Sequence, residues 1–469
     1  MGNQGGTNHP AFRRVLWAEP GWPPREVEES MRLCGNKMRL LVCLSSIGLG
    51  LAAPAQAVTR TTAASGYWTN PATWTGGNIP GVGEDAVIGP AHSVTVDVSP
   101  ASLNTLSNDG AVVFSGWSTV MTSTWVTVAG TVTQAPQSAT STNPMGQWVP
   151  DARIAIVCTN LTVAVGGRID ASAAGFGCPD VASATGYGPG AGICGSGGGG
   201  GGHGGRGGNT TGNSGIGGPE YGSIFAPDTP GSGGAASHVP PYPGGRGGGL
   251  VQITAAGTVT VHGAILANGQ KGTGALGTSY SGSGAGGGIL ITCASLAGAG
   301  TIAASGEQGA YYSGSGGGGR IALNCQDCTN WTGVAQADTG TSSPGDWGTL
   351  YIQDLALLKP VATSQVFRLY GPSAWSPPSL AMTNSYIRFE EAPFTLTVGS
   401  GLSLSTSTLA ISNAVCVVQG NVVADSSRVN LYGSAASLVS MNVGGSMTLT
   451  NSSTLHVFSG STNGAAPLY

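Results

Sequence analysis

Four copies of one pattern decide the fold: Ile154-Ala155-Ile156-Val157-Cys158, Val251-Gln252-Ile253-Thr254-Ala255, Ile289-Leu290-Ile291-Thr292-Cys293 and Ile321-Ala322-Leu323-Asn324-Cys325. A degenerate fifth copy is Leu350-Tyr351-Ile352-Gln353-Asp354. A second aliphatic residue, which we call the second aliphatic marker, lies 13 to 15 residues after the first residue of each of the first four copies. These residues are Ile169, Ile265, Ile302 and Val334. Each repeat unit is therefore predicted to be two short strands joined by a turn.

The segments between the copies vary in length and are rich in glycine. Three of them end in a Gly-Gly-Gly triplet, at residues 247–249, 286–288 and 317–319. Constant strands with variable returns are typical of repeat proteins, in which each unit buries its apolar face against its neighbours. The sequence therefore predicts an all-β fold, a right-handed parallel β-helix (solenoid) with long glycine-rich returns and strands about 4.8 Å apart.

The first, third and fifth positions of each copy share one face, because side chains alternate along a strand. We expect the first positions to stack in one column, formed by Ile154, Val251, Ile289, Ile321 and Leu350. The fifth positions are Cys158, Ala255, Cys293 and Cys325. These cysteines are either small buried hydrophobes or, for Cys293 and Cys325 on adjacent strands, close enough to form a disulfide.

Seven cysteines follow residue 57, and an odd number leaves at least one free or paired between chains. Cys178 and Cys194 flank a loop and are the predicted disulfide candidates. Cys158 and Cys416 are expected to resist alkylation until the protein unfolds. Cys325 and Cys328 have CxxC spacing, but no second pair or histidine cluster completes a zinc site, so no metal is predicted.

The composition excludes several classes of protein. Glycine accounts for 82 of the 469 residues and only 8% are charged, which disfavours helices. Residues 58–469 carry 11 basic and 17 acidic side chains, so the sequence predicts no nucleic-acid partner. No apolar run after the signal approaches the roughly 18 residues that span a bilayer, so no transmembrane helix is expected in the mature chain. The glycine runs do not lead through a Lys-Ser/Thr pair into a helix, and no cofactor is predicted.

Residues 37–57 resemble a secretion signal, with basic Lys37 and Arg39, an apolar run from Leu40 to Leu51, and a small-residue cleavage site ending at Ala57. The predicted localisation is therefore secreted, extracellular or on the cell surface. The charged stretch before residue 37 differs from the rest of the chain, and we expect translation to begin at Met31 or Met38.

Composition divides the chain into five predicted parts. They are an N-terminal extension and secretion signal (1–57), an N-terminal cap and first strands (58–150), the glycine-rich repeat β-helix (151–358), a proline-containing connector (359–393) and C-terminal β-helix turns (394–469). Within 58–150, Trp117, Trp125 and Trp148 are interspersed among short alternating runs. The chain is expected to continue beyond Tyr469, since the last strands carry no capping signature.

A tryptophan-rich segment opens the mature chain and contains Trp68, Asn70, Pro71, Trp74, Pro80, Glu84 and Asp85. It resembles the start of the eight-glycine (G-eight type) extracellular domain over about 60 residues. This resemblance implies a cap on the β-helix of a secreted or cell-surface protein, and some relatives bind or act on polysaccharide such as hyaluronan. Trp68 and Trp74 would either cover the open end of the core or stack on sugars.

The longest return, residues 171–249, is low in sequence complexity and has two interpretations. It is either disordered or a bundle of extended polyglycine helices, which form only where side chains are absent. The shared Gly-Gly-Gly endings favour partly ordered packing against the strands.

Tyr280, Tyr311 and Tyr312 precede glycine-rich segments at matching places in successive repeats. They would form an exposed aromatic stripe for sugar stacking, or they would pack onto the glycine layer. Ionisable residues are scattered over the returns, and Arg168 and Asp170 are the only close pair of opposite charges on a strand. No catalytic residue is predicted.

The function expected from these features is that of a structural or adhesive protein, secreted or on the cell surface, that binds extracellular polysaccharide or cell-surface material without catalysis. The alternative is a β-helix polysaccharide lyase or glycoside hydrolase, which requires acids and bases converging at one site. A third alternative is binding of ice or a crystal surface through threonine ladders such as Thr258-Val259-Thr260.

Overall fold

The structure, a computed structural model, describes residues 57–458 except 213, 239–241, 276–278, 310–311, 341–342, 392 and 434–438, together with residues 467–468. The chain divides into two units, Met1–Ala55 and Gln56–Tyr469. The expected secretion signal, apart from Ala57, and the candidate start residues Met31 and Met38 lie outside the described residues. The described part is all-β: its strands pair mainly in parallel, and it contains no α-helix. Its only helical turns are η1 (Pro71–Thr73), η2 (Thr75–Gly77) and η3 (Leu355–Leu357).

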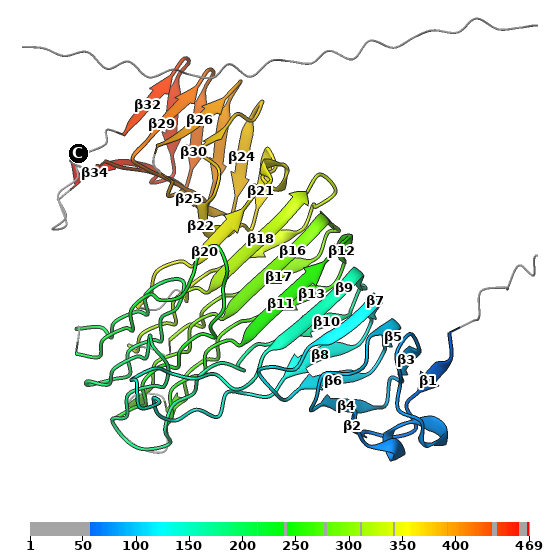
Figure 1. The fold of residues 1–469 in the computed structure, drawn as a ribbon. Helices are drawn as coiled ribbons and strands as arrows, with labels where there is room; N and C mark the ends of the chain where they lie inside the picture. Colours follow the sequence, from blue (N-terminus) through cyan, green and yellow to red (C-terminus); the bar gives the residue numbers. More distant parts are fainter. Residues whose placement is uncertain are drawn as a thin grey trace, which may run out of the picture. The chain divides into compact units, whose positions relative to one another are not determined.

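One long parallel ladder runs through almost the whole described chain (Figure 1). In pairing order its strands are β1 (Thr59–Thr61), β3 (Asp85–Ile88), β5 (Leu103–Asn108), β7 (Met121–Val128), β9 (Ile154–Val163), β11 (Leu250–Ala255), β16 (Gly288–Ala297), β18 (Arg320–Asp327), β20 (Thr349–Ile352), β22 (Val366–Tyr370), β25 (Tyr386–Phe389), β28 (Thr408–Ser412), β31 (Arg428–Tyr432) and β34 (Thr454–Phe458). A short strand, β12 (Thr258–Val261), pairs with the second halves of β9 and β16.

A second parallel ladder accompanies the first over the N-terminal two thirds. It consists of β2 (Gly66–Tyr67), β4 (Ser93–Val96), β6 (Ala111–Phe114), β8 (Thr131–Gln134), β10 (Arg168–Asp170), β13 (Ala264–Leu266), β17 (Thr301–Ala303) and β19 (Val334–Gln336). The chain alternates between the two ladders, so strands close in sequence lie in different ladders and strands one repeat apart are neighbours.

Two further parallel ladders accompany the C-terminal part. One contains β21 (Val361–Thr363), β24 (Leu380–Thr383), β27 (Leu402–Ser405), β30 (Val422–Asp425) and β33 (Met447–Thr450). The other contains β23 (Ala374–Trp375), β26 (Phe394–Val398), β29 (Ala414–Val418) and β32 (Ser440–Val443). The antiparallel pairs are β14 (Gly274–Ala275) with β15 (Ser279–Tyr280), and β34 with β35 (Pro467–Leu468). The predicted connector, residues 359–393, is itself built of strands β21 to β25.

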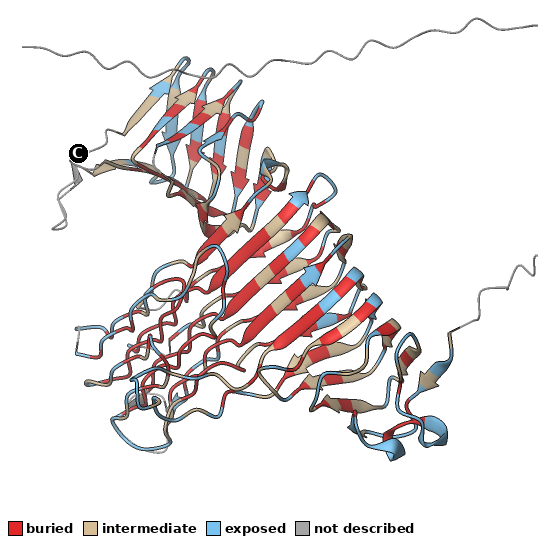
Figure 2. Cartoon of the chain, viewed as in Figure 1, coloured by how far each residue is buried: buried red, intermediate tan, exposed pale blue. Residues whose placement is uncertain are grey.

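The predicted column of first positions is confirmed. Ile154 pairs with Val251, Val251 with Ile289, Ile289 with Ile321, and Ile321 with Leu350. All five side chains are fully buried, and Figure 2 shows that the strands of the long ladder are largely buried where these residues lie, with intermediate and exposed residues interspersed. The repeated pattern in the sequence is therefore the register of the ladder. In the C-terminal part, Val398, Val418 and Val443 are register partners on successive strands in the same way.

The second aliphatic marker is confirmed for three copies and wrong for the fourth. Ile169, Ile265 and Ile302 are register partners, but the residue that pairs with Ile302 is Ala335. Val334 is turned to the half-buried side. Counted between register partners, the segment from Asp327 to Val334 is one residue longer than the segment from Ser295 to Thr301, and Trp331 is buried in it. A one-residue slip moves a side chain to the other face of a strand, which explains the exchange.

The glycine-rich returns form an ordered bundle of extended segments beside the ladders (Figure 1). Their backbones hydrogen-bond to one another: the N–H of Gly200 donates to the carbonyl of Gly208 at 3.0 Å, and the N–H of Gly317 donates to that of Gly201 at 2.9 Å. A Cβ added to Gly200 would lie 1.8 Å from the carbonyl oxygen of Ser315. For the described residues, the packed alternative is thus confirmed and disorder is wrong.

Candidate functional site

Four hydroxyl side chains form a column on the outward face of the long ladder. Ser107 of β5 pairs with Thr127 of β7, Thr127 with Thr162 of β9, and Thr162 with Thr260 of β12. The apolar residues that precede and follow these hydroxyls along the strands, such as Val126 and Val128 on either side of Thr127, are buried. Alternation therefore places the four hydroxyls outward at intervals of about 4.8 Å, the strand spacing.

Trp125 lies in the next outward column, between Thr105 of β5 and Asn160 of β9. Its side chain is 54% exposed, although tryptophan is usually well buried. Its neighbours are held in place. The Thr105 hydroxyl donates to the Asp85 carboxylate at 2.8 Å, and the Asn160 side-chain oxygen accepts from the backbone N–H of Thr258 at 2.9 Å. The indole ring thus stands on a rigid sheet whose outward side chains are mostly hydroxyls. We call Trp125, its two neighbours Thr105 and Asn160, and the hydroxyl column together the Trp125 face.

A shallow hollow of about 250 Å³ adjoins the Trp125 face. Its lining residues are Ser102, Thr122, Ser123, Thr124, Val157, Cys158 and Thr159. Thr124 and Thr159 directly precede Trp125 and Asn160 in the sequence. Hydroxyls both donate and accept hydrogen bonds, and none of the lining side chains is formally charged at neutral pH. An aromatic ring beside such a hollow suits a neutral, hydroxyl-rich ligand with an apolar ring face.

Two of the predicted tyrosines come together at the tips of the returns. The rings of Tyr280 and Tyr312 meet edge to face with their centroids 5.9 Å apart. Tyr312 is 58% exposed, whereas Tyr280 is half-buried. Tyr311, the third member of the predicted stripe, lies outside the described residues.

The predicted binding tryptophans of the N-terminal segment lie in the core. Trp68 and Trp74 are each 1% exposed, and their ring centroids are 4.8 Å apart. The indole N–H of Trp74 donates to the backbone carbonyl of Trp68 at 2.9 Å. Because neither ring reaches the surface, sugar stacking by Trp68 and Trp74 is not possible in this structure.

Cys178 and Cys194 are both half-buried free thiols in this structure. Burial raises the pKa of the Cys178 thiol to about 11, and burial also raises the pKa of Cys194. A Cys178–Cys194 disulfide stays a prediction. On the inward face, burial likewise raises the pKa of the Cys158 thiol to about 11.

Several charged residues that are scattered in the sequence converge where the returns meet β18, β22 and β25. Arg368 pairs with Glu220 at 3.0 Å, and Arg388 pairs with Glu390 at 3.0 Å. Buried Arg320 donates from Nε to the backbone carbonyl of Tyr221 at 2.6 Å. Arg368 and Arg320 thus tie the returns to strands β22 and β18, whereas Arg388 and Glu390 pair with each other at β25. Arg168 and Asp170, which both lie on β10, are 4.0 Å apart, and among the ion pairs of the described residues they are the only one with both members in one strand, as expected.

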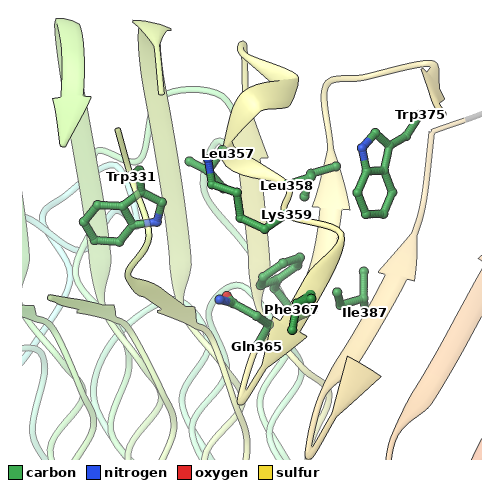
Figure 3. A pocket seen from close by; sticks show the side chains of 10 residues that line it. Trp331, Leu357, Leu358, Lys359, Gln365, Phe367, Trp375 and Ile387 are labelled. Carbon is green, nitrogen blue, oxygen red and sulfur yellow. The ribbon is translucent and has the colours of Figure 1, made fainter. Parts of the chain in front are cut away.

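The aromatic pocket in Figure 3 lies beside the first strands of the predicted connector, with Trp331 and Trp375 on opposite sides. Its other lining residues are Leu357, Leu358, Lys359, Val361, Ala362, Gln365, Phe367 and Ile387. The interior has about 20 Å³ of free space, which is room for about one water molecule. The pocket is thus too small for a sugar or a cofactor in this structure.

Among the described residues, no group of three or more His, Cys, Asp or Glu side chains is arranged to hold a metal ion. The described part of the chain also has no helix long and apolar enough to cross a membrane. The Trp125 face thus belongs to an all-β protein with parallel ladders. No protein-family model, curated protein sequence or solved structure matches this chain.

The Trp125 face is not among the sites that the sequence predicts, although part of its signal is present in the sequence. In Thr124-Trp125-Val126-Thr127-Val128, the two valines mark the inward side and place Trp125 and Thr127 outward. The other residues of the face could not be predicted from the sequence, because the strands that carry Thr162 and Thr260 are separated by a long return.

Proposed function

We propose that this chain is a right-handed parallel β-helix, secreted or on a cell surface, that binds extracellular polysaccharide or cell-surface material without turning it over. The fold part of the proposal is supported by the way the chain passes repeatedly from one parallel ladder to the next. Each strand pairs with the strand one repeat later, as in stacked repeats. The secretion signal and the likeness of the Trp68–Asp85 segment to the G-eight extracellular domain support the location.

The Trp125 face is the observation that carries the binding proposal. An exposed tryptophan on a rigid sheet offers a flat surface at a low cost in conformational entropy, and its ring can cover the apolar face of a sugar. The hydroxyl column and the adjoining hollow supply hydrogen-bond partners. Because the column repeats along the ladder, one polymer chain can engage several strands at once, and weak contacts then add up to useful affinity.

The test is co-sedimentation of the purified chain with a panel of insoluble neutral and acidic polysaccharides. We expect Trp125→Ala to weaken binding about 5- to 30-fold, corresponding to about 1–2 kcal/mol for loss of a central aromatic contact. Tyr67→Ala is the matched control, because Tyr67 is an aromatic residue of similar exposure, 57%, on strand β2. Equal binding by the Trp125 variant and the wild type would refute the assignment, and selective loss in Tyr312→Ala would move the site to the returns.

The enzyme alternative is tested in the same panel. Release of reducing ends reports hydrolysis, and absorbance of unsaturated products reports elimination. We expect neither above the level of a heat-denatured sample. Reproducible turnover that is lost in Asp170→Asn, His262→Ala or Arg320→Ala would instead establish a lyase or hydrolase.

A further inference from the structure

Two cysteines face each other across adjacent strands of the long ladder. Cys293 of β16 is the register partner of Cys325 of β18. Both are buried, at 4% and 0% exposure, and their sulfur atoms are 2.8 Å apart. Even the smaller carbon atoms reach their best nonbonded separation only at about 3.5 Å. The two thiols are therefore packed more closely than unbonded sulfur atoms prefer.

The backbone geometry at this position is compatible with a covalent bond. Adjacent parallel strands lie about 4.8 Å apart, and disulfides join residues whose Cα atoms are about 4.4 to 6.8 Å apart. The other two inward-facing cysteines have no cysteine as register partner: Cys158 of β9 pairs with Ala255, and Cys416 of β29, in another ladder, pairs with Leu396 and Met441. Among the described residues, Cys293 and Cys325 are the one pair of cysteines in direct register.

A third thiol, Cys328, completes the cluster. It lies just after β18, is 1% exposed, and its backbone N–H donates to the Asp354 carboxylate at 2.6 Å. A hydrogen bond with the Cys325 thiol lowers the pKa of Cys328, whereas hydrogen bonds with Cys293 and then Cys328 raise the pKa of Cys325. Cys328 thus lies within hydrogen-bonding reach of Cys325, so as a thiolate, the attacking form in disulfide exchange, it is placed to attack a disulfide at Cys325.

We propose that Cys293 and Cys325 form a disulfide between consecutive strands, and that Cys328 exchanges into it. In the first step, a small-molecule disulfide such as oxidised glutathione is reduced to two thiols while Cys293 and Cys325 lose two protons and two electrons to form the bond. In the second step, the Cys328 thiolate attacks the sulfur of Cys325. The Cys325–Cys328 bond forms, the Cys293–Cys325 bond breaks, and Cys293 leaves as a thiolate that takes up the proton given up by Cys328.

The two bonds have different mechanical consequences. The Cys293–Cys325 disulfide ties β16 to β18 and closes the whole return between them, so it removes many conformations of the unfolded chain. The Cys325–Cys328 disulfide closes only a short turn and leaves the two strands joined by hydrogen bonds alone. Exchange by Cys328 therefore switches a covalent link between neighbouring strands on or off. This proposal is independent of polysaccharide binding.

Tryptic mapping of the full chain distinguishes the two bonds, because cleavage after Arg320 separates Cys293 from the other two cysteines. The peptide Gly272–Arg320 carries Cys293, and the peptide Ile321–Arg368 carries both Cys325 and Cys328. A link between the two peptides reports the cross-strand bond, and a loss of two hydrogens within the second peptide reports the exchanged bond. The chain is produced in an oxidising compartment, unfolded in excess alkylating agent and digested without reductant, beside a sample from a reducing cytoplasm.

We expect the oxidised wild type to show the link between peptides, with Cys328→Ala showing only that link and Cys293→Ala showing only the internal bond. Cys325→Ala removes both bonds, and Cys416→Ala is the matched control that leaves the map unchanged. The oxidised wild type should also unfold a few degrees above the reduced sample, and Cys325→Ala should make this difference smaller, whereas Cys416→Ala should not. Full alkylation of Cys293, Cys325 and Cys328 in the oxidised wild type would overturn the proposal, and this result does not depend on any variant folding.

Discussion

A single methyl group should disrupt the glycine bundle, and Gly200→Ala is the sharpest way to add one. The Cβ of the variant would lie 1.8 Å from the carbonyl oxygen of Ser315, whereas real Cβ contacts are essentially never closer than 3.0 Å. The backbone segments must therefore move apart by at least about 1 Å. Such overpacking costs about 1–3 kcal/mol.

The displacement also strains two backbone hydrogen bonds of Gly200. Its N–H donates to the Gly208 carbonyl at 3.0 Å, and its carbonyl accepts from the Gly218 N–H at 2.9 Å. Each bond contributes about 1 kcal/mol net. The local loss of stability is then about 2–5 kcal/mol, which corresponds to roughly 30-fold or more faster local opening.

Hydrogen exchange followed by mass spectrometry is the suitable assay, because repeat proteins open locally and a single global midpoint can hide the effect. Amides in residues 197–208 and 313–319 should exchange faster in Gly200→Ala, while β16 and β18 keep their protection. Gly81→Ala is the control, since its Cβ would lie 3.6 Å from the Glu84 carboxylate, an ordinary contact. Unchanged exchange in residues 197–208 of the Gly200 variant would refute the close packing of the bundle.

Three further predictions concern titratable side chains. Burial, and to a smaller extent repulsion from Arg320, lowers the pKa of His203 from its ordinary 6.5 to about 3. Between pH 6.5 and pH 3 the unfolded chain therefore binds a proton at His203 that the folded chain does not bind. The free energy of unfolding should consequently fall as the pH falls through this range. Urea midpoints measured against pH should fall less steeply in His203→Gln, and identical slopes would contradict this role for His203. Cys178 and Cys194 should be cross-linked in chain from an oxidising compartment, which a peptide map without reductant checks; two alkylated thiols would count against the pairing. Cys158 and Cys416, whose pKa values burial raises to about 11 and about 12, should be alkylated only after unfolding, and rapid labelling of native Cys158 would show that the inward face opens.

The sequence predicts the ladder because its signal is local and repeated. Ile289 and Ile321 occupy the same position in copies of one pattern, so period-two alternation gives the inward face and equal position gives the register. Val334 is the exception. The pattern fixes where a strand begins, but the length of the turn before β19 is set by how Trp331 packs, and composition does not reveal that packing.

The bundle and the Trp125 face could be predicted only in part. Glycine has no side chain, so the bundle carries no apolar periodicity, and the partners of Gly200 emerge only when segments from different returns are placed side by side. The outward direction of Trp125 follows from the valines after it. Its neighbours Thr105 and Asn160 follow only once successive strands are stacked, because register between distant strands is a property of the assembled ladder.

The close packing around Gly200 also limits how this part of the protein can evolve. Every base change in the first or second position of a glycine codon either adds a side chain or stops translation, and in the bundle an added side chain meets a neighbouring carbonyl. Most of these glycines therefore do not tolerate substitution by another residue. Duplication or deletion of whole returns remains open, since the strands on either side keep their register whatever the length between them.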